Sequence, residues 1–177
     1  MAVSQPQTQF YTLSEFEALI ARPENAERLL ELIGGELREK LPTQEHGMIA
    51  ANIITALNAY TAPRKLGRVS TEARHQLPPD EQDPDHPHSR LPDVSYVSKE
   101  QYATLVKKGA VPVMPDLAVE IQSPDQDDKE MLDTAEYYLA HGTKAVLLVY
   151  PDRRIVEKLP SGAKRLFTGD DVIILTG

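Results

Sequence analysis

The chain has 177 residues, 41% of them hydrophobic, and a formal net charge of -8. This length suits one well-covered core and is slightly short for two, so we expect a disordered tail over residues 1–10 and a single domain over residues 11–177. The acidic balance does not favour nucleic acid, whose phosphates reward clustered lysines and arginines, so any DNA contact requires a local basic patch. Because cysteine is absent, disulfides, thiolate metal sites and a cysteine nucleophile are excluded.

No segment approaches the length of a membrane span, and the first residues lack the basic and apolar parts of a signal peptide. We therefore expect a cytoplasmic protein without membrane association. Small basic groups are the only candidates for contact with a DNA backbone. They are Arg64-Lys65-Arg68, Lys107-Lys108 and Arg153-Arg154.

The first third of the chain is predicted to contain two helices and a hairpin. A helix is expected over 12–22, because Thr12 and Glu15 form a capping box ahead of an apolar face. Two strands follow, joined by the glycine pair at 34–35, since a two-residue turn needs positive φ. A second helix is expected over roughly 44–62.

The middle of the chain alternates between strands and loops. Residues 68–77 alternate as a strand does, and 78–90 are proline-rich and acidic, which favours a surface loop. A strand resumes over 91–97. A short helix is then predicted over 98–109, with Ser98 as its cap.

The last third predicts a β-α-β unit with parallel strands. Strand 115–122 is followed by a helix expected to start at Ser123–Gln126, and 144–150 is apolar enough for an interior strand. Short strands are expected over 154–159, 163–167 and 171–175. The predicted class is therefore α/β (α+β), with a mixed sheet flanked by helices.

One acidic residue stands out, because Glu120 lies among apolar residues of a predicted strand. A carboxylate left unpaired there is costly, so it needs a metal ion or a hydrogen-bond donor. Alternation places Gln122 on the same side as Glu120. If the strand carrying Asp93 lies alongside, Asp93 and Glu120 can converge on one hard cation, for which Mg²⁺ is the expected ion.

The pair Pro92-Asp93 with Glu120-x-Gln122 resembles the pattern of the PD-(D/E)XK nuclease superfamily. The sequence is more similar to the Uma-type putative restriction endonuclease family, over most of its length. The pieces that carry this resemblance are ELIGGE at 31–36, a helix opening near His46, LPDVSYV, PDLAVEIQSPD and YYLAHGTKAVLLVYPDRR. The resemblance implies a restriction-endonuclease-like domain that cleaves DNA with Mg²⁺ or Mn²⁺. A homodimer is expected, because two symmetric sites suit the cutting of both strands.

By this resemblance Asp93 and Glu120 would be catalytic metal ligands, and the metal would activate water for in-line attack on a phosphodiester. Gln122 would be the third catalytic residue, where the superfamily has lysine. Family relatives carry their lysine on the following helix, at the position of Thr134. Since neither position holds a cation here, and glutamine lends no positive charge, activity would be weak or lost.

Two other functions remain open at this point. The first is a nuclease-fold protein that binds DNA or metal without cleaving, and the second is a protein-interaction module. In the latter the carboxylates would be ordinary members of ion pairs, with Arg74 as one partner for Glu120. The simplest interpretation of three further side chains is an ordinary surface position, and only the family resemblance implies a role for them at the site. They are His46, Glu31 and Glu36. His86 and His88 are interpreted as solvated loop residues.

Overall fold

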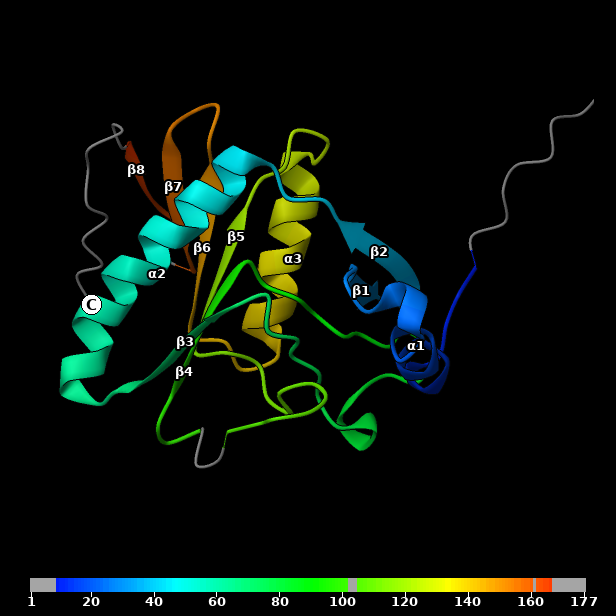
Figure 1. Cartoon of the computed structure of the whole chain (residues 1–177). Helices are drawn as coiled ribbons and strands as arrows, with labels where there is room; N and C mark the ends of the chain where they lie inside the picture. Colours follow the sequence, from blue (N-terminus) through cyan, green and yellow to red (C-terminus); the bar gives the residue numbers. More distant parts are fainter. Residues whose placement is uncertain (1–8, 102–104, 161, 167–177) are drawn as a thin grey trace, which may run out of the picture.

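The structure is a computed structural model that describes residues 9–101, 105–160 and 162–166. In these ranges the chain forms a six-stranded sheet, a separate two-stranded hairpin and three α-helices (Figure 1). The predicted fold class, a mixed sheet flanked by helices, is confirmed. The first eight residues of the predicted tail and the strand predicted over 171–175 lie outside the described residues.

The helices are α1 (Leu13–Ile20), α2 (Gln44–Arg64) and α3 (Asp128–Ala140). The hairpin consists of β1 (Leu29–Ile33) and β2 (Glu36–Lys40). The sheet strands are β3 (Gly67–Thr71), β4 (Val94–Ser98), β5 (Leu117–Ile121), β6 (Ala145–Tyr150), β7 (Ile155–Leu159) and β8 (Ala163–Leu166). Short 3₁₀ turns occupy Pro23–Asn25 and Pro79–Glu81.

The six strands of the sheet follow one another in chain order, from β3 to β8. Only β5 and β6 pair in parallel, and α3 connects them, so the predicted β-α-β unit is confirmed. All other described neighbours pair antiparallel. The carboxyl ends of β5 and β6 therefore lie at the same end of the sheet. Asp93, directly before β4, also lies at this end.

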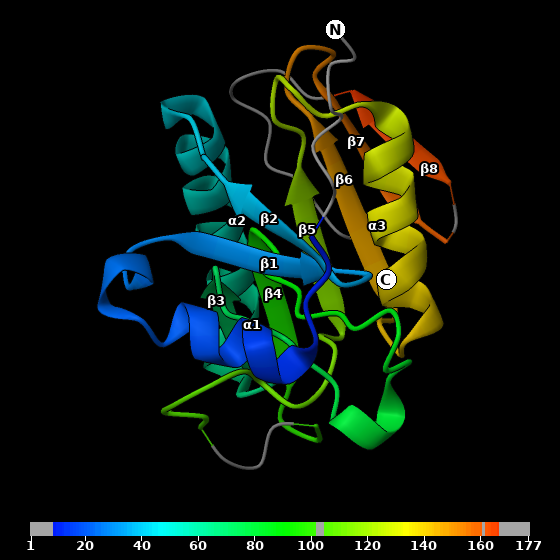
Figure 2. The same cartoon turned by 90° about the vertical axis from the view of Figure 1, so that its right-hand side faces the viewer.

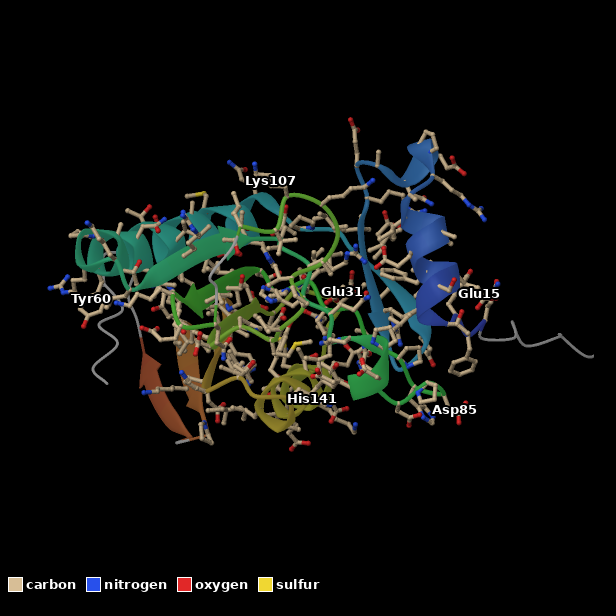
Figure 3. All side chains as sticks on the ribbon, turned by 90° about the horizontal axis from the view of Figure 1, so that it is seen from below. Glu15, Glu31, Tyr60, Asp85, Lys107 and His141 are labelled. Carbon is tan, nitrogen blue, oxygen red and sulfur yellow. The ribbon has the colours of Figure 1, made fainter. Side chains whose placement is uncertain are left out.

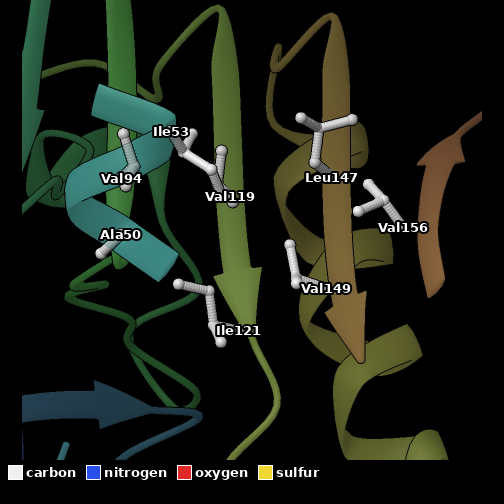
Figure 4. Close-up of a cluster of buried hydrophobic side chains, with 8 residues drawn as sticks. All are labelled: Ala50, Ile53, Val94, Val119, Ile121, Leu147, Val149 and Val156. Carbon is white, nitrogen blue, oxygen red and sulfur yellow. The ribbon is translucent and has the colours of Figure 1, made fainter. Parts of the chain in front are cut away.

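The two long helices cover opposite faces of this sheet (Figures 1 and 2). Alternation along β5 explains why, since Val119 packs against α2 and Ala118 packs against α3. Figure 4 shows the core on the α2 side, where Ile53 lies over Val119. Burial of these apolar side chains is the main stabilising contribution to the sheet.

The hairpin crosses near β4 and β5 and is packed on its outer side by α1 (Figure 2). Its turn has glycines at positive φ, +57° for Gly34 and +86° for Gly35, as the sequence predicts. The hairpin is joined to the loop before β4 by main-chain hydrogen bonds between Leu32 and Ser89. These bonds fix the hairpin over the end of the sheet where Asp93 lies.

Three predicted elements are corrected by the structure. The strand expected over 68–77 ends at Thr71, because Glu72 adopts a positive φ of 51° that breaks the extended run. The helix expected over 98–109 is not present in its described residues, since Ser98 still belongs to β4 and a turn follows it. The loop over 78–90 ends in residues that are not at the surface, with Arg90 only 2% exposed.

The start of α3 is also four residues later than predicted. Ser123 and Gln126 exchange hydrogen bonds in a turn, so they do not begin the helix. The actual capping box is formed by Asp127 and Glu130. Both sets of residues satisfy the same capping pattern. Ser123 and Gln126 form the turn that follows β5, and Asp127 and Glu130 cap the helix.

Candidate active site

The antiparallel register of β4 and β5 brings the two predicted carboxylates together. Val94 pairs with Val119. Because the strands are antiparallel, the residue before Val94 lies opposite the residue after Val119, and these two residues are Asp93 and Glu120. A hydrogen bond of 2.7 Å from the Ile121 main-chain nitrogen to Asp93 Oδ2 closes this end of the pairing. Both side chains are buried, at 4% and 6% exposure. The sequence prediction that Asp93 and Glu120 converge agrees with this geometry.

The cation between them comes from the hairpin. Lys40, the last residue of β2, places Nζ 2.6 Å from Asp93 Oδ1 and 3.1 Å from Glu120 Oε2. The same nitrogen donates to the carbonyl oxygen of Leu91 at 2.9 Å. One ammonium group thus bridges both carboxylates, and neither is held by a guanidinium of its own. Arg74, the partner considered for Glu120 from sequence, instead pairs with Glu17. Lys40 nevertheless gives both carboxylates the ion pairs that the interaction-module alternative predicts.

Each carboxylate also has a second side-chain partner besides Lys40. Tyr138, on α3, donates its hydroxyl to Glu120 Oε1 at 2.9 Å. His46, in the first turn of α2, has Nε2 3.2 Å from Asp93 Oδ1. The helices on the two faces of the sheet therefore each contribute one side chain that orients a carboxylate. His46 reaches the site, which the sequence alone left undecided.

A third carboxylate and a second cation complete the buried cluster. Glu31, on β1, lies inside the molecule (Figure 3) and accepts a 2.7 Å hydrogen bond from the Leu91 main-chain nitrogen. Arg90 Nε lies 4.0 Å from Glu31 Oε1, and Arg90 Nη2 donates to Thr134 Oγ1 at 2.9 Å. The position where family relatives carry lysine is thus a threonine bonded to a buried guanidinium.

The charges of this cluster do not balance. Counting Glu31, Asp93 and Glu120 against Lys40 and Arg90, three carboxylates face two cations, which leaves one formal negative charge. Burial raises the pKa of Glu120 to about 7, and the neighbouring carboxylates add to the rise against the opposing effect of Lys40. The cluster therefore has room, electrostatically, for one more positive charge.

Asp93 behaves in the opposite way. Burial acts to raise its pKa, but the Lys40 ammonium and the His46 ring together hold the pKa of Asp93 below its ordinary value. Asp93 is therefore the carboxylate that loses its proton more readily. Glu120, whose pKa burial raises, is the one that keeps its proton more readily. A pair of acids with separated pKa values is typical of functional sites.

The third predicted catalytic residue, Gln122, lies at the rim and not in the cluster. Its amide nitrogen donates to Gln126 O and to Asp128 Oδ1, both at 3.1 Å. It lines a shallow pocket of about 120 Å³ that His46 also lines, between the start of α2 and the turn after β5. Asp93 and Glu120 do not line this pocket, but His46, which does, also contacts Asp93, so the pocket lies beside the buried carboxylates.

The remaining sequence candidates lie elsewhere. Glu36 pairs with Arg38 at the surface of the hairpin, and His86 pairs with Asp83 in the loop. His88 stacks on Tyr137 with ring centroids 4.0 Å apart, and burial lowers its pKa to about 4. Among the residues that the structure describes, no hydrogen bond or ion pair joins any of these three side chains to Asp93 or Glu120.

Sequence reasoning missed the contributions of Lys40, Tyr138 and Arg90. Lys40 reads as an exposed residue at the end of a hairpin strand, and only the docking of the hairpin on the sheet directs it inward. The apolar spacing of its helix predicts Tyr138 on the buried face, but nothing in the sequence indicates the partner of its hydroxyl. Arg90 lies in a stretch whose composition is that of a surface loop.

The donors present are of the kind that a divalent ion takes. Within the described residues, no group of three or more His, Asp or Glu side chains is arranged to hold a metal. The set on offer is two carboxylate oxygens, from Asp93 and Glu120, together with the Leu91 carbonyl, all around one point. Such hard oxygen ligands fit Mg²⁺ or Mn²⁺, which usually keep water for their remaining positions.

The comparisons with known proteins identify the family of the chain and support its fold. The family model of Uma2, described as putative restriction endonuclease, matches residues 13–175. The chain belongs to the Uma2 family. No curated protein matches the sequence. The family predicted from sequence motifs is thereby confirmed.

The fold of this Uma2 protein is similar to that of a solved structure. It is the crystal structure of a putative nuclease belonging to DUF820 from Anabaena variabilis, with a TM-score of 0.71 and 24% sequence identity. The match covers 94% of this chain and 89% of that one. In the part of the Uma2 chain that the structure describes, no helix combines the length and apolar content of a membrane span.

Proposed function

We propose that this Uma2 protein is a divalent-metal-dependent endonuclease that hydrolyses phosphodiester bonds of DNA. The observation that carries the proposal is the convergence of Asp93 Oδ1 and Glu120 Oε2 on a single point, within 2.6 and 3.1 Å of one nitrogen. Family membership supports a nuclease-like function. Mg²⁺ or Mn²⁺ is the proposed cofactor, with Asp93 and Glu120 as its ligands.

In this mechanism the residues of the chain prepare the site before substrate arrives. Tyr138 and the Ile121 main-chain nitrogen each hold one carboxylate oxygen, which leaves Asp93 Oδ1 and Glu120 Oε2 aimed at the same point. Holding both oxygens in place in advance reduces the reorganisation needed during the reaction. A bound divalent ion would offset the negative charge that develops on the phosphate.

Gln122 and His46 are proposed to act at the pocket. Both line it, so both can contact a phosphate or a water that enters from solvent. Because the Gln122 amide nitrogen is already bonded to the turn before α3, its oxygen is the group that could orient a water. The expected homodimer and the cytoplasmic location remain predictions.

The test is plasmid nicking in Mg²⁺ or Mn²⁺ with wild-type protein, Asp93→Asn and Glu120→Gln. We expect cleavage that requires the ion and falls by at least about 100-fold in either variant, since each removes a ligand charge. Glu36→Gln, which changes a surface carboxylate paired with Arg38, is the matched control and should retain activity. Ion-dependent cleavage that survives both site changes would contradict the assignment.

A second candidate is favoured by the arrangement of the cations. Gln122 is engaged with Gln126 and Asp128, and Thr134 is engaged with Arg90, so neither lysine position of the superfamily delivers a charge. A nuclease-fold protein that binds DNA or metal without cleaving would have these features. It predicts ion binding in calorimetry with no nicking at any ion concentration.

A further inference from the structure

The ammonium group of Lys40 has the surroundings of a bound metal ion. Its three hydrogen-bond acceptors are Asp93 Oδ1 at 2.6 Å, Glu120 Oε2 at 3.1 Å and the Leu91 carbonyl oxygen at 2.9 Å. An ammonium has three donors, so these three oxygens satisfy it fully. They are also the oxygens identified above as the ligands on offer to a divalent ion.

The other oxygens of the two carboxylates are already committed. Asp93 Oδ2 accepts from the Ile121 main-chain nitrogen, and Glu120 Oε1 accepts from the Tyr138 hydroxyl. An ion that binds both carboxylates without breaking these two bonds uses the oxygens that Lys40 now contacts, of which Asp93 Oδ1 also lies 3.2 Å from His46 Nε2. Ligand distances for Mg²⁺ are about 2.1 Å, so the ion and the ammonium cannot share this point.

The charge count favours exchange of the ammonium for the ion. With Lys40 in place, the cluster of Glu31, Asp93, Glu120 and Arg90 keeps one formal negative charge, as counted above. A divalent ion in place of the ammonium would bring that count to zero. The side chain of Lys40 is 18% exposed, on a hairpin strand, so it has a route out of the cluster.

We propose that Lys40 is a tethered cation that occupies the metal position, so that a divalent ion binds Asp93 and Glu120 only by displacing its ammonium. This inference rests on the proposed function for the identity of the ion. It extends that function by assigning the missing lysine to the hairpin and by making it a competitor of the metal. The two positions where the superfamily pattern and the family resemblance place a lysine, Gln122 and Thr134, hold no cation in this chain.

The test is calorimetric titration of Mn²⁺ into wild-type protein and into Lys40→Met. Methionine keeps an unbranched apolar stem of similar length but removes the competing charge. We expect Lys40→Met to bind Mn²⁺ at least about tenfold more tightly, because a unit charge at ion-pair distance in a buried site is removed. Lys40→Arg, which keeps the charge, should not show this gain.

Lys144→Met is the matched control. Lys144 Nζ lies 2.6 Å from the buried carboxylate of Asp116, so this pair has the same chemistry but belongs to the other end of the sheet. Its removal should leave Mn²⁺ affinity unchanged. A gain in Lys144→Met equal to that in Lys40→Met would overturn the inference, because it would be a general effect of lost positive charge.

Lys40→Met leaves two buried carboxylates without their shared cation, so its folding is followed by thermal unfolding with and without Mn²⁺. If the variant is unfolded alone, folding restored by millimolar Mn²⁺ supports the inference, and a failure to restore it overturns the inference. If it is folded, Mn²⁺ should raise its Tm more than that of wild type. An equal or smaller rise counts against the displacement of Lys40.

The outcomes separate this inference from the proposed function. Cleavage by wild type together with unchanged Mn²⁺ affinity in Lys40→Met overturns the inference alone. Tighter Mn²⁺ binding by Lys40→Met with no nicking of DNA by wild type supports the inference and removes the endonuclease proposal. Failure of both proteins to bind Mn²⁺ overturns both.

Discussion

At the scale of single residues, the buried cluster depends on donors that hold each carboxylate in one orientation. Glu120 is the most demanding member, because burial raises its pKa to about 7 while its oxygens still accept from Lys40 and Tyr138. A buried acceptor that loses its partner costs more than the lost hydrogen bond alone. Tyr138, completely buried in the last turn of α3, is therefore expected to stabilise this arrangement through its hydroxyl.

Tyr138→Phe is expected to lower the free energy of unfolding by about 1–3 kcal/mol, because the ring still fits while Glu120 Oε1 loses its donor. Urea unfolding followed by circular dichroism measures the change. Tyr60→Phe, at an exposed tyrosine of α2, is the control and should differ from wild type by less than about 0.5 kcal/mol. Equal stability of Tyr138→Phe and wild type would show that the hydroxyl contributes nothing to the site.

A second residue acts outside the site. His75 is completely buried, with Nδ1 2.8 Å from the Val113 carbonyl and Nε2 3.1 Å from Ser95 Oγ. Since a neutral imidazole can donate from one nitrogen and accept at the other, this pairing uses the uncharged ring. Burial lowers the pKa of His75 below 6.5, against the opposing effect of the Val113 carbonyl.

The pH dependence follows from that direction. Because the folded-state pKa is lower than the unfolded one, the unfolded chain binds the extra proton first, and stability falls as pH drops below about 6.5. His75 contributes up to about 1.4 kcal/mol per pH unit there, until its folded pKa is reached. Urea unfolding at pH 7, 6 and 5 should show a shallower decline in His75→Gln than in wild type. Parallel declines would exclude His75 as the source.

At the scale of elements, the hairpin adds charged side chains to the end of the sheet where Asp93 and Glu120 lie. It delivers Glu31 and Lys40 from its two strands, and its main chain is bonded to the segment that leads into β4. α2 and α3 then supply His46 and Tyr138 from opposite faces of the sheet. The candidate site is thus assembled from the hairpin, β4, β5, α2 and α3.

The turn of this hairpin makes a test possible. Gly35 has φ of +86°, and a Cβ there would lie 3.2 Å from the Phe10 ring, so Gly35→Ala is expected to cost about 1–2 kcal/mol. Gly47→Ala has the opposite expectation. Gly47 lies in α2 with open space around it, so alanine should stabilise by about 0.5–1 kcal/mol. Thermal unfolding of both variants decides, and the same sign for both would contradict the assignment of the turn.

At the scale of the whole molecule, sequence patterns predicted most of the sheet and the pair of acids. Alternation and turn glycines were sufficient for the hairpin, for β4 to β6 and for the parallel unit around α3, because those signals are local. The convergence of Asp93 and Glu120 followed from two strands lying side by side. These parts of the fold depend on short-range periodicity and on one pairing.

The rest depends on how distant segments dock, which periodicity does not encode. Lys40 enters the site only because the hairpin crosses the end of the sheet, and Arg90 is buried although its surroundings in the sequence are polar. The start of α3 was misplaced because two overlapping capping patterns compete and tertiary packing selects the second. Sequence reasoning therefore predicted the two acids that converge and missed the cations beside them.

The charge of the whole molecule also limits where DNA, the substrate of the proposed function, can lie. The net charge of -8 repels a polyanion, so contact requires exposed basic residues at the edge of the sheet that carries the pocket. Arg154 is exposed in the turn after β6, and the pocket is lined by Pro151 and Asp152 of the same turn. Arg68 is also exposed but pairs in register with Val97, at the opposite end of the sheet.

Arg154→Glu is therefore expected to weaken DNA binding about 3- to 10-fold near physiological salt, because it replaces one phosphate contact with a repelling charge. Arg68→Glu introduces the same change of charge away from the pocket and should weaken binding less. Fluorescence anisotropy of a labelled duplex, measured over a range of salt concentrations, also gives the number of phosphate contacts from the slope. Equal losses in the two variants would mean that DNA responds to net charge alone and does not lie at the edge of the sheet where Asp93 and Glu120 meet.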